Sequence, residues 1–141
     1  MLYLYFILLF QNTTPNYIEA YHDITDKNQE LQFIERYKNS KDVSEQAYVI
    51  SLQMKQAEYK IFPWAKLSIF NTGKSKLEAL ISENPENIDL RYVRLVIQEQ
   101  LPKLLNYHAH IETDKAFLQN LLNKPDHTDY LDSYILENTS L

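Results

Sequence analysis

Glycine is nearly absent from this sequence of 141 residues, in which Gly73 is the only one. An average usage of about 7% would give roughly ten glycines in a chain of this length. Phosphate-binding loops, dinucleotide-binding turns, nucleophile elbows and calcium-binding loops all need glycine where the backbone turns sharply or approaches a ligand. The sequence therefore contains none of these motifs.

Cysteine is absent altogether. Its absence excludes thiol nucleophiles, iron–sulfur clusters, cysteine-bound zinc and disulfide bonds. The chain does not need such crosslinks, because 45% of its residues are hydrophobic. A domain of about 150 residues also buries roughly two thirds of the surface that its unfolded chain exposes. We expect one compact domain without a cofactor.

Basic residues are outnumbered by acidic ones, 14 to 19, which gives a formal net charge of −5. This balance argues against a protein that mainly binds the phosphate backbone of nucleic acids. The charges are unevenly spread, because residues 111–141 hold six acids and two lysines, whereas residues 55–76 hold five lysines and one acid, Glu58. A basic middle and an acidic end could steer a charged partner, or they could form solvated faces.

The longest apolar run comes at the start, with nine residues from Leu2 to Phe10. As a helix this run would be roughly 14 Å long, whereas a membrane-spanning helix has to cross about 30 Å. It is therefore either the apolar part of a secretory signal or the first element of the core. We expect residues 1–12 to form this apolar segment and residues 13–141 a single helical domain. A signal implies a secreted or periplasmic protein, and a packed segment a cytoplasmic one.

Apolar residues recur at the helical period along most of the chain, and no strict alternation extends over the length of a strand. This pattern predicts an all-α protein, either an irregular helical bundle or a short stack of antiparallel helical hairpins. Capping residues such as Thr14, Asp26, Asp42 and Asn84 precede expected helix starts. The expected helices cover residues 15–24, 27–39, 43–61, 73–84, 86–100, 112–123 and 127–138.

Two of these segments have contrasting apolar patterns. Residues 43–61 carry a single apolar stripe, which predicts a helix packed on one side only. The stripe consists of Ala47, Ile50, Met54, Ala57 and Ile61. In residues 86–100 the apolar arc is too wide for a surface helix, which predicts a central position. The narrow polar face of this second helix holds Arg91, Arg94 and Gln98.

One segment in the middle of the chain resembles the junction between two hairpins of tetratricopeptide (TPR)-like helical repeats. A small residue, Ala79, is followed there by the proline turn Asn84–Asn87 and by an amphipathic helix that begins at Ile88. The resemblance covers about 35 residues and implies TPR-like helical hairpins. It lacks the Trp, Leu-Gly and Tyr of the repeat's first helix, so it does not imply a regular array. More loosely, residues 84–118 resemble small helical proteins of unknown function from Bacteroidota-type bacteria.

Four potential metal ligands lie close together in the sequence: His108, His110, Glu112 and Asp114. Imidazole nitrogens and carboxylate oxygens are suitable ligands for zinc, nickel or iron. Residues two apart converge only in extended backbone or a loop, because on a helix they point about 200° apart. The alternative for the histidines is solvation or a contact with a helix end. This cluster defines one hypothesis, a small-ligand or metal-binding carrier.

The first hypothesis is a non-enzymatic helical interaction or scaffold module that binds another protein, and no local motif predicts an enzyme. Its candidate contact residues are Trp64, Arg91 and Arg94. Tryptophan is favoured at protein interfaces, and two arginines on one helix face could hold a carboxylate or a phosphate. Alternatively, Trp64 and its aromatic neighbours form a core joint between two helices, and the arginines form salt bridges with neighbouring helices. The sequence does not indicate the oligomeric state.

Overall fold

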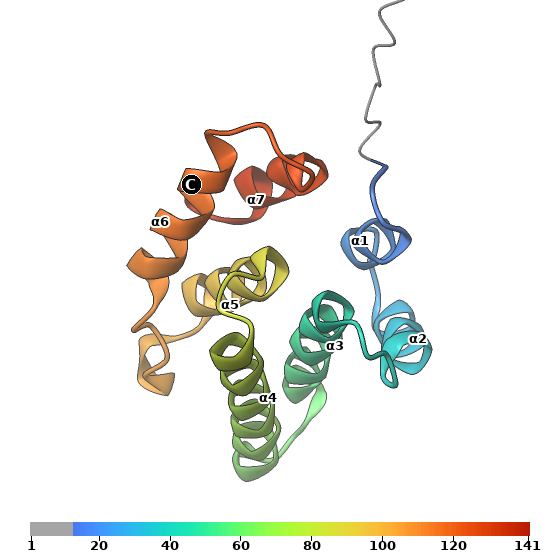
Figure 1. Ribbon diagram of the computed structural model, residues 1–141. Coiled ribbons are helices and arrows are strands. Elements are labelled where there is room, and N and C mark those ends of the chain that lie inside the picture. Colours follow the sequence, from blue (N-terminus) through green and yellow to red (C-terminus); the bar gives the residue numbers. More distant parts are fainter. Residues whose placement is uncertain (1–12) are drawn as a thin grey trace, which may run out of the picture.

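The computed structural model describes residues 13–141 (Figure 1). The expected apolar segment, residues 1–12, lies outside the described residues, so its role as a signal or a core element stays a prediction. Within the described range the chain forms seven α-helices, three short 3-10 helices and no β-strand. The prediction of an all-α helical bundle is confirmed.

The helices have the following bounds. The α-helices are α1 (Asn16–His22), α2 (Lys27–Tyr37), α3 (Val43–Lys55), α4 (Pro63–Glu83), α5 (Ile88–Gln100), α6 (Ile111–Leu122) and α7 (Asp132–Asn138). The 3-10 helices are η1 (Gln56–Tyr59), η2 (Lys103–Leu105) and η3 (Asp129–Leu131).

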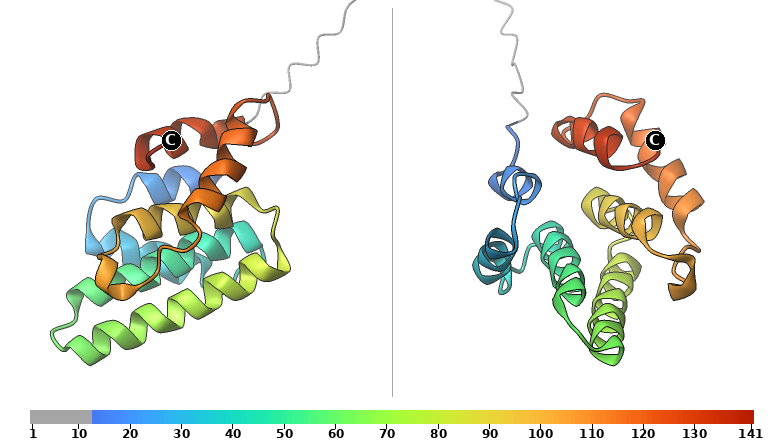
Figure 2. Two further views of the ribbon diagram at one scale, coloured as in Figure 1. Left: turned by 90° about the vertical axis from the view of Figure 1, so that its left-hand side faces the viewer. Right: turned by 180° about the vertical axis from the view of Figure 1, so that it is seen from behind.

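Helix α5 occupies the centre of the bundle, as its wide apolar arc predicts (Figures 1 and 2). It packs against α3, α4 and α6. Its Tyr92 hydroxyl is 2.9 Å from His22 Nε2 of α1 and 3.3 Å from the Tyr134 carbonyl oxygen of α7. Even the polar residues Arg94 and Gln98 are buried, so the expected polar face of this helix lies inside the protein.

Side-chain caps fix the starts of three helices. Asp26 accepts a hydrogen bond from the Gln29 amide at the start of α2, and Asp42 accepts bonds from the first-turn amides of α3. These two caps are those that the sequence predicts. The cap of α5 is Asn87, whose side chain accepts from the Leu90 amide, so the expected cap at Asn84 is wrong. Likewise, α1 follows Pro15 without a side-chain cap.

The prediction that residues 43–61 form a helix packed on one side is wrong. Helix α3 ends at Lys55, contacts α2, α4 and α5, and buries Tyr48 and Leu52 in addition to members of the predicted stripe. The chain leaves the helix through η1, and Ile61 beyond it is 88% exposed. The helical period of the apolar residues therefore extends past the end of the helix itself.

Helix α4 begins at Pro63, ten residues before the expected start at residue 73. Proline suits the first turn of a helix, because the amide hydrogen it lacks would have no partner there. The buried residues of α4 recur at helical spacing and are Phe70, Gly73, Leu77 and Ile81. Gly73 therefore lies inside the helix, where glycine is unfavourable by about 1 kcal/mol relative to alanine.

The close approach of α3 and α4 explains this glycine. A Cβ atom added to Gly73 would lie 2.1 Å from Met54 Cγ and 2.8 Å from Met54 Sδ. Both distances are far shorter than van der Waals contact, which is about 3.5–4.0 Å between carbon atoms. The hairpin formed by α3 and α4 (Figure 2) therefore leaves no room for a side chain at this position unless Met54 moves.

Substituting Gly73→Ala tests this packing. Overpacking a core lowers the free energy of unfolding by about 1–3 kcal/mol. The better helix propensity of alanine offsets about 1 kcal/mol of this loss, so we expect a net loss of about 1 kcal/mol. In a Met54→Ala background the same substitution should be neutral or stabilising. Urea denaturation of the four proteins of this double-mutant cycle measures the coupling, and a coupling near zero would contradict the explanation.

Candidate functional site

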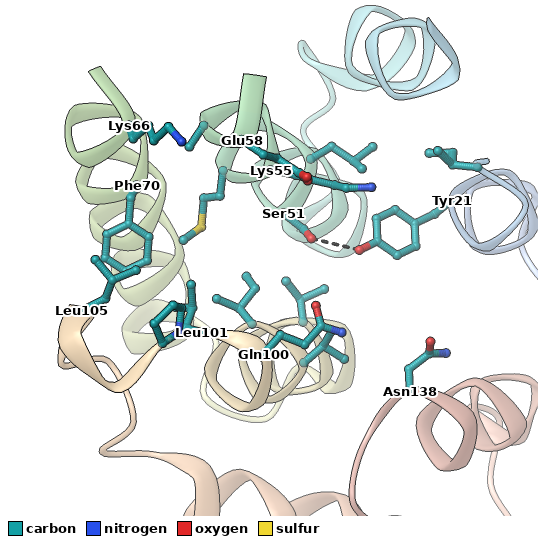
Figure 3. Close-up of a pocket in the computed structure, with 18 of the residues that line it drawn as sticks. Tyr21, Ser51, Lys55, Glu58, Lys66, Phe70, Gln100, Leu101, Leu105 and Asn138 are labelled. Carbon is teal, nitrogen blue, oxygen red and sulfur yellow. Dashed lines mark hydrogen bonds between the residues drawn. The ribbon is translucent and has the colours of Figure 1, made fainter. Parts of the chain in front are cut away.

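A groove of about 910 Å³ opens between α1, α3, α4 and α5, with Asn138 of α7 at its edge (Figure 3). Pockets that bind ligands typically measure roughly 300–1,000 Å³ and are mostly apolar. The apolar residues that line this groove are Ile24, Leu52, Met54, Ala57, Pro63, Leu67, Phe70, Val93, Val96, Ile97, Leu101, Pro102 and Leu105. Its size and lining make the groove the candidate functional site.

Helix α5 contributes one apolar wall of the groove. Val93 is fully packed, whereas Val96 and Ile97 are only partly buried and remain accessible from the groove. These two residues belong to the same wide apolar arc that places α5 in the centre of the bundle. The groove thus exposes part of a core helix that no other element among the described residues covers completely.

The chain after α5 closes one end of the groove. The helix ends at Gln100, before Pro102, which has no amide hydrogen to continue the helical bonding. The short turn η2 follows, and Asn106 then adopts a left-handed backbone conformation with a φ of 48°, which asparagine tolerates better than most residues. Figure 3 shows Leu105 beside Phe70 of α4 at this end. The tight turn therefore adds an apolar side chain to the groove.

Tyr21 and Ser51 form a polar contact at the opposite end, with their hydroxyl oxygens 2.9 Å apart (Figure 3). Burial raises the pKa of the Tyr21 phenol, so it stays protonated at neutral pH. A protonated phenol does not act as a general base toward Ser51. The pair can orient a ligand by hydrogen bonding, but its chemistry does not activate the serine as a nucleophile.

His22 lies at the edge of the groove and has partners on both ring nitrogens. Its Nδ1 is 2.7 Å from the Ile18 carbonyl oxygen and its Nε2 is 2.9 Å from the Tyr92 hydroxyl. The ring also stacks on Tyr134, with centroids 3.9 Å apart. Burial lowers the pKa of His22 below its ordinary value, so the imidazole is neutral at pH 7. With Nδ1 donating to the carbonyl, Nε2 accepts from Tyr92.

Charged side chains border the groove where η1 approaches α4 (Figure 3). Lys55 Nζ lies 2.6 Å from Oε1 of Glu30, whose side chain is buried. Lys66 and Glu58 are exposed, and within residues 13–141 neither forms an ion pair. The groove therefore combines an apolar interior with a rim that can contact charged groups.

Arg91 and Arg94 lie away from the groove, in an ion-pair network that connects α5 to its neighbours. Arg94 is buried, with Nε 2.7 Å from Oδ2 of Asp114 in α6 and Nη1 2.9 Å from Oε2 of Glu78 in α4. Arg91 Nη1 is 2.9 Å from the other carboxylate oxygen of Asp114. These arginines therefore form salt bridges with neighbouring helices, which is the alternative to a partner contact that the sequence left open.

The predicted metal ligands do not converge. Asp114 is fully buried and bound to the two arginines, while His108 Nε2 lies 3.1 Å from the Leu101 carbonyl oxygen. His110 immediately precedes α6 with its Nε2 4.0 Å from Glu78, and Glu112 is exposed on the first turn. No group of three or more potential metal ligands comes together in the part of the chain that the structure describes. The metal hypothesis for this cluster is therefore wrong.

Trp64 is 70% exposed and stacks on Phe62, with ring centroids 4.6 Å apart. Phe62 is 54% and Ile61 88% exposed, and we call these three residues the apolar tip. The sequence also allowed the aromatic residues near Pro63 to pack in the core between two helices. Phe70 does so and is buried, whereas the apolar tip does not. Trp64 is therefore accessible to a partner, as the interaction hypothesis requires.

Sequence reasoning did not identify the groove itself. Its lining comes from segments as far apart as Tyr21 and Asn138, and each apolar residue in it fits an ordinary core pattern. One signal was present: the apolar arc of residues 86–100 is too wide for a surface helix. Val96 and Ile97 belong to that arc, but their accessibility depends on how the neighbouring helices pack.

Comparisons with known proteins give no relative for this chain: no protein-family model matches it, and neither does any curated protein or solved structure. The resemblance to TPR-like hairpins and to small Bacteroidota-type proteins therefore stays a prediction. In residues 13–141, no helix has both the length and the apolar character that crossing a membrane requires.

Removing the carboxylate of Asp114 should strongly destabilise the fold, because it leaves the buried Arg94 without its main partner. Breaking a buried ion pair from one side typically costs about 3–5 kcal/mol, and we expect Asp114→Ala to fall in this range by urea denaturation. The control is Lys38→Ala, which removes an exposed pair with Glu35 and should cost less than about 1 kcal/mol. Equal effects of the two substitutions would contradict the assigned role.

The lowered pKa of His22 predicts a loss of stability in mild acid. The neutral imidazole is favoured in the folded state, so its contribution is fully present above the unfolded-state pKa of about 6.5. That contribution is lost as the pH falls through the lower folded-state pKa. Chemical denaturation between pH 7.5 and about pH 5 should therefore show a falling free energy of unfolding. His22→Gln should flatten this slope.

Proposed function

We propose that this protein is a non-enzymatic binding module that holds an apolar helical segment of another protein in its groove. The observation that carries the proposal is the partly buried apolar wall of α5, with Val96 and Ile97 accessible inside a groove of about 910 Å³. Helix-in-groove recognition uses such surfaces, with the ligand contributing apolar residues at i, i+3, i+4 and i+7.

The apolar lining of the groove suits this type of ligand. A helix has a diameter of about 10 Å with its side chains and rises 5.4 Å per turn. Two turns of a bound helix are therefore about 11 Å long, and the face turned toward α5 enters the groove. A ligand of about two turns presents three or four apolar side chains on one face, which is enough to contact both the α5 wall and Phe70 at the closed end.

The rim adds a preference for one end of the ligand. Lys66 is exposed at the groove and unpaired among the described residues, whereas Glu58 nearby carries the opposite charge. An acidic residue at the N-terminus of a bound helix would be stabilised both by its own helix dipole and by Lys66. We therefore expect ligands with an apolar face and an acidic first turn near this lysine.

A library of short amphipathic helices displayed on phage tests the proposal with the full chain as bait. Selected peptides should show apolar residues at helical spacing, and their affinity should fall at least tenfold with Ile97→Asp, because an unpaired carboxylate in an apolar groove is costly. Val96→Thr, which preserves the shape, should weaken binding by a few-fold. Fluorescence anisotropy of labelled peptides measures these effects, and circular dichroism shows whether each variant remains folded.

Leu136→Asp is the matched control, since Leu136 is 54% exposed on α7 and does not line the groove. It should leave peptide affinity unchanged. Selected peptides that bind Ile97→Asp and the original chain equally would overturn the proposal. So would native mass spectrometry showing a small apolar molecule bound in the absence of any selected peptide, a result that favours the alternative of a small-ligand carrier.

A further inference from the structure

The apolar tip protrudes at one end of the molecule. It follows η1 and includes the first turn of α4, in the connection between α3 and α4 at the lower end of Figure 1 and at the left in the first view of Figure 2. All residues from Glu58 to Trp64 are exposed. Soluble monomers seldom expose contiguous large apolar side chains without an interaction that uses them.

Folding does not account for these side chains. Ile61, Phe62 and Trp64 are 88%, 54% and 70% exposed, whereas Phe70, two turns further along α4, is 7% exposed and belongs to the core. The stacking of Phe62 on Trp64 joins the two rings into one exposed apolar surface. Polar residues at these positions would therefore leave the core intact.

The charge next to the apolar tip is on balance positive although the protein as a whole is acidic. Lys60 and Lys66 flank it and form no ion pair within residues 13–141. From residue 58 to residue 66 the sequence contains two lysines and one acid, Glu58, against a net charge of −5 for the whole chain. An anionic surface therefore attracts this end of the molecule and repels the rest, which favours a single orientation.

We infer that the apolar tip inserts into the interfacial region of an anionic lipid bilayer. Tryptophan and phenylalanine are suited to the boundary between headgroups and acyl chains. Lysine can extend its ammonium group to the phosphates while its methylene chain stays among apolar groups. A short convex protrusion of this kind reaches the headgroup region without a complementary pocket. The inference shares Lys66 with the rim of the groove, uses none of its apolar interior and does not depend on the proposed peptide ligand.

Trp64 is the only tryptophan in the sequence, so its fluorescence reports on the apolar tip alone. This matters because residues 2–10 are also apolar and sedimentation with lipid would not locate the contact. We expect the emission of the full chain to shift to shorter wavelength on adding vesicles of phosphatidylcholine mixed with phosphatidylglycerol. Brominated acyl chains should quench it. Vesicles of phosphatidylcholine alone should give a much weaker response, and added salt should reduce the response to the anionic vesicles.

Three variants separate the apolar and the charged contributions. Ile61→Asp and Phe62→Asp retain Trp64 and should abolish the shift. The double substitution Lys60→Ala and Lys66→Ala should weaken vesicle affinity by roughly tenfold or more, because each lysine adds to the attraction of an anionic surface. Leu136→Asp is the matched control, with the same 54% exposure as Phe62 on a helix far from the tip, and should bind as the original chain does.

Three outcomes would overturn the inference. The first is an unchanged Trp64 emission while the protein sediments with vesicles, which would place the contact on another surface. The second is an emission shift that is equal for anionic and neutral lipid, which would remove the role of the lysines. The third is a shift that appears with rising protein concentration and without lipid, which would show that a second copy of the chain covers the tip.

Discussion

Burial of α5 is the constraint on which the rest of the structure depends, because a helix surrounded by others must satisfy its polar groups internally. Asp89 accepts a hydrogen bond from Tyr48, Tyr92 lies within bonding distance of His22, and Arg94 binds Asp114. Each of these contacts connects α5 to a different neighbour. The amide of Gln98 is the exception, with no hydrogen-bond partner among the described residues. The polar contacts thus set the positions of α1, α3 and α6, of which α1 and α3 form walls of the groove.

Local signals in the sequence predict the helices and the place of α5 well. Asp26 and Asp42 cap their helices as expected, because a capping oxygen acts on amides two or three residues away. The central position of α5 follows from its apolar arc, which depends on its own residues alone. The helix boundaries around residues 56–72 could not be predicted in this way. There the apolar period continues through η1 and past the end of α3, while Gly73 sits inside α4 for a reason that involves Met54 on another helix.

The candidate site was less predictable, since it depends on which side chains meet across the bundle. Arg91 and Arg94 have the spacing of two arginines that bind one anionic ligand. In the structure they instead form ion pairs with Asp114 and Glu78, which are distant in sequence. His108 and Asp114 similarly point to different partners despite their proximity in the chain. Trp64 remains the one candidate contact residue that the structure leaves accessible. Composition alone could not distinguish its exposure from the burial of Phe70, because both are large aromatic residues near Pro63.

The contact between Gly73 and Met54 also bears on both surfaces described above. Only the side chain of Met54 separates α4 from α3 at Gly73, so the two helices approach each other closely in the hairpin that carries the apolar tip. Lys66, Leu67 and Phe70 line the groove on the same helix that carries Trp64. A contact at Trp64 and a ligand in the groove therefore involve the same helix.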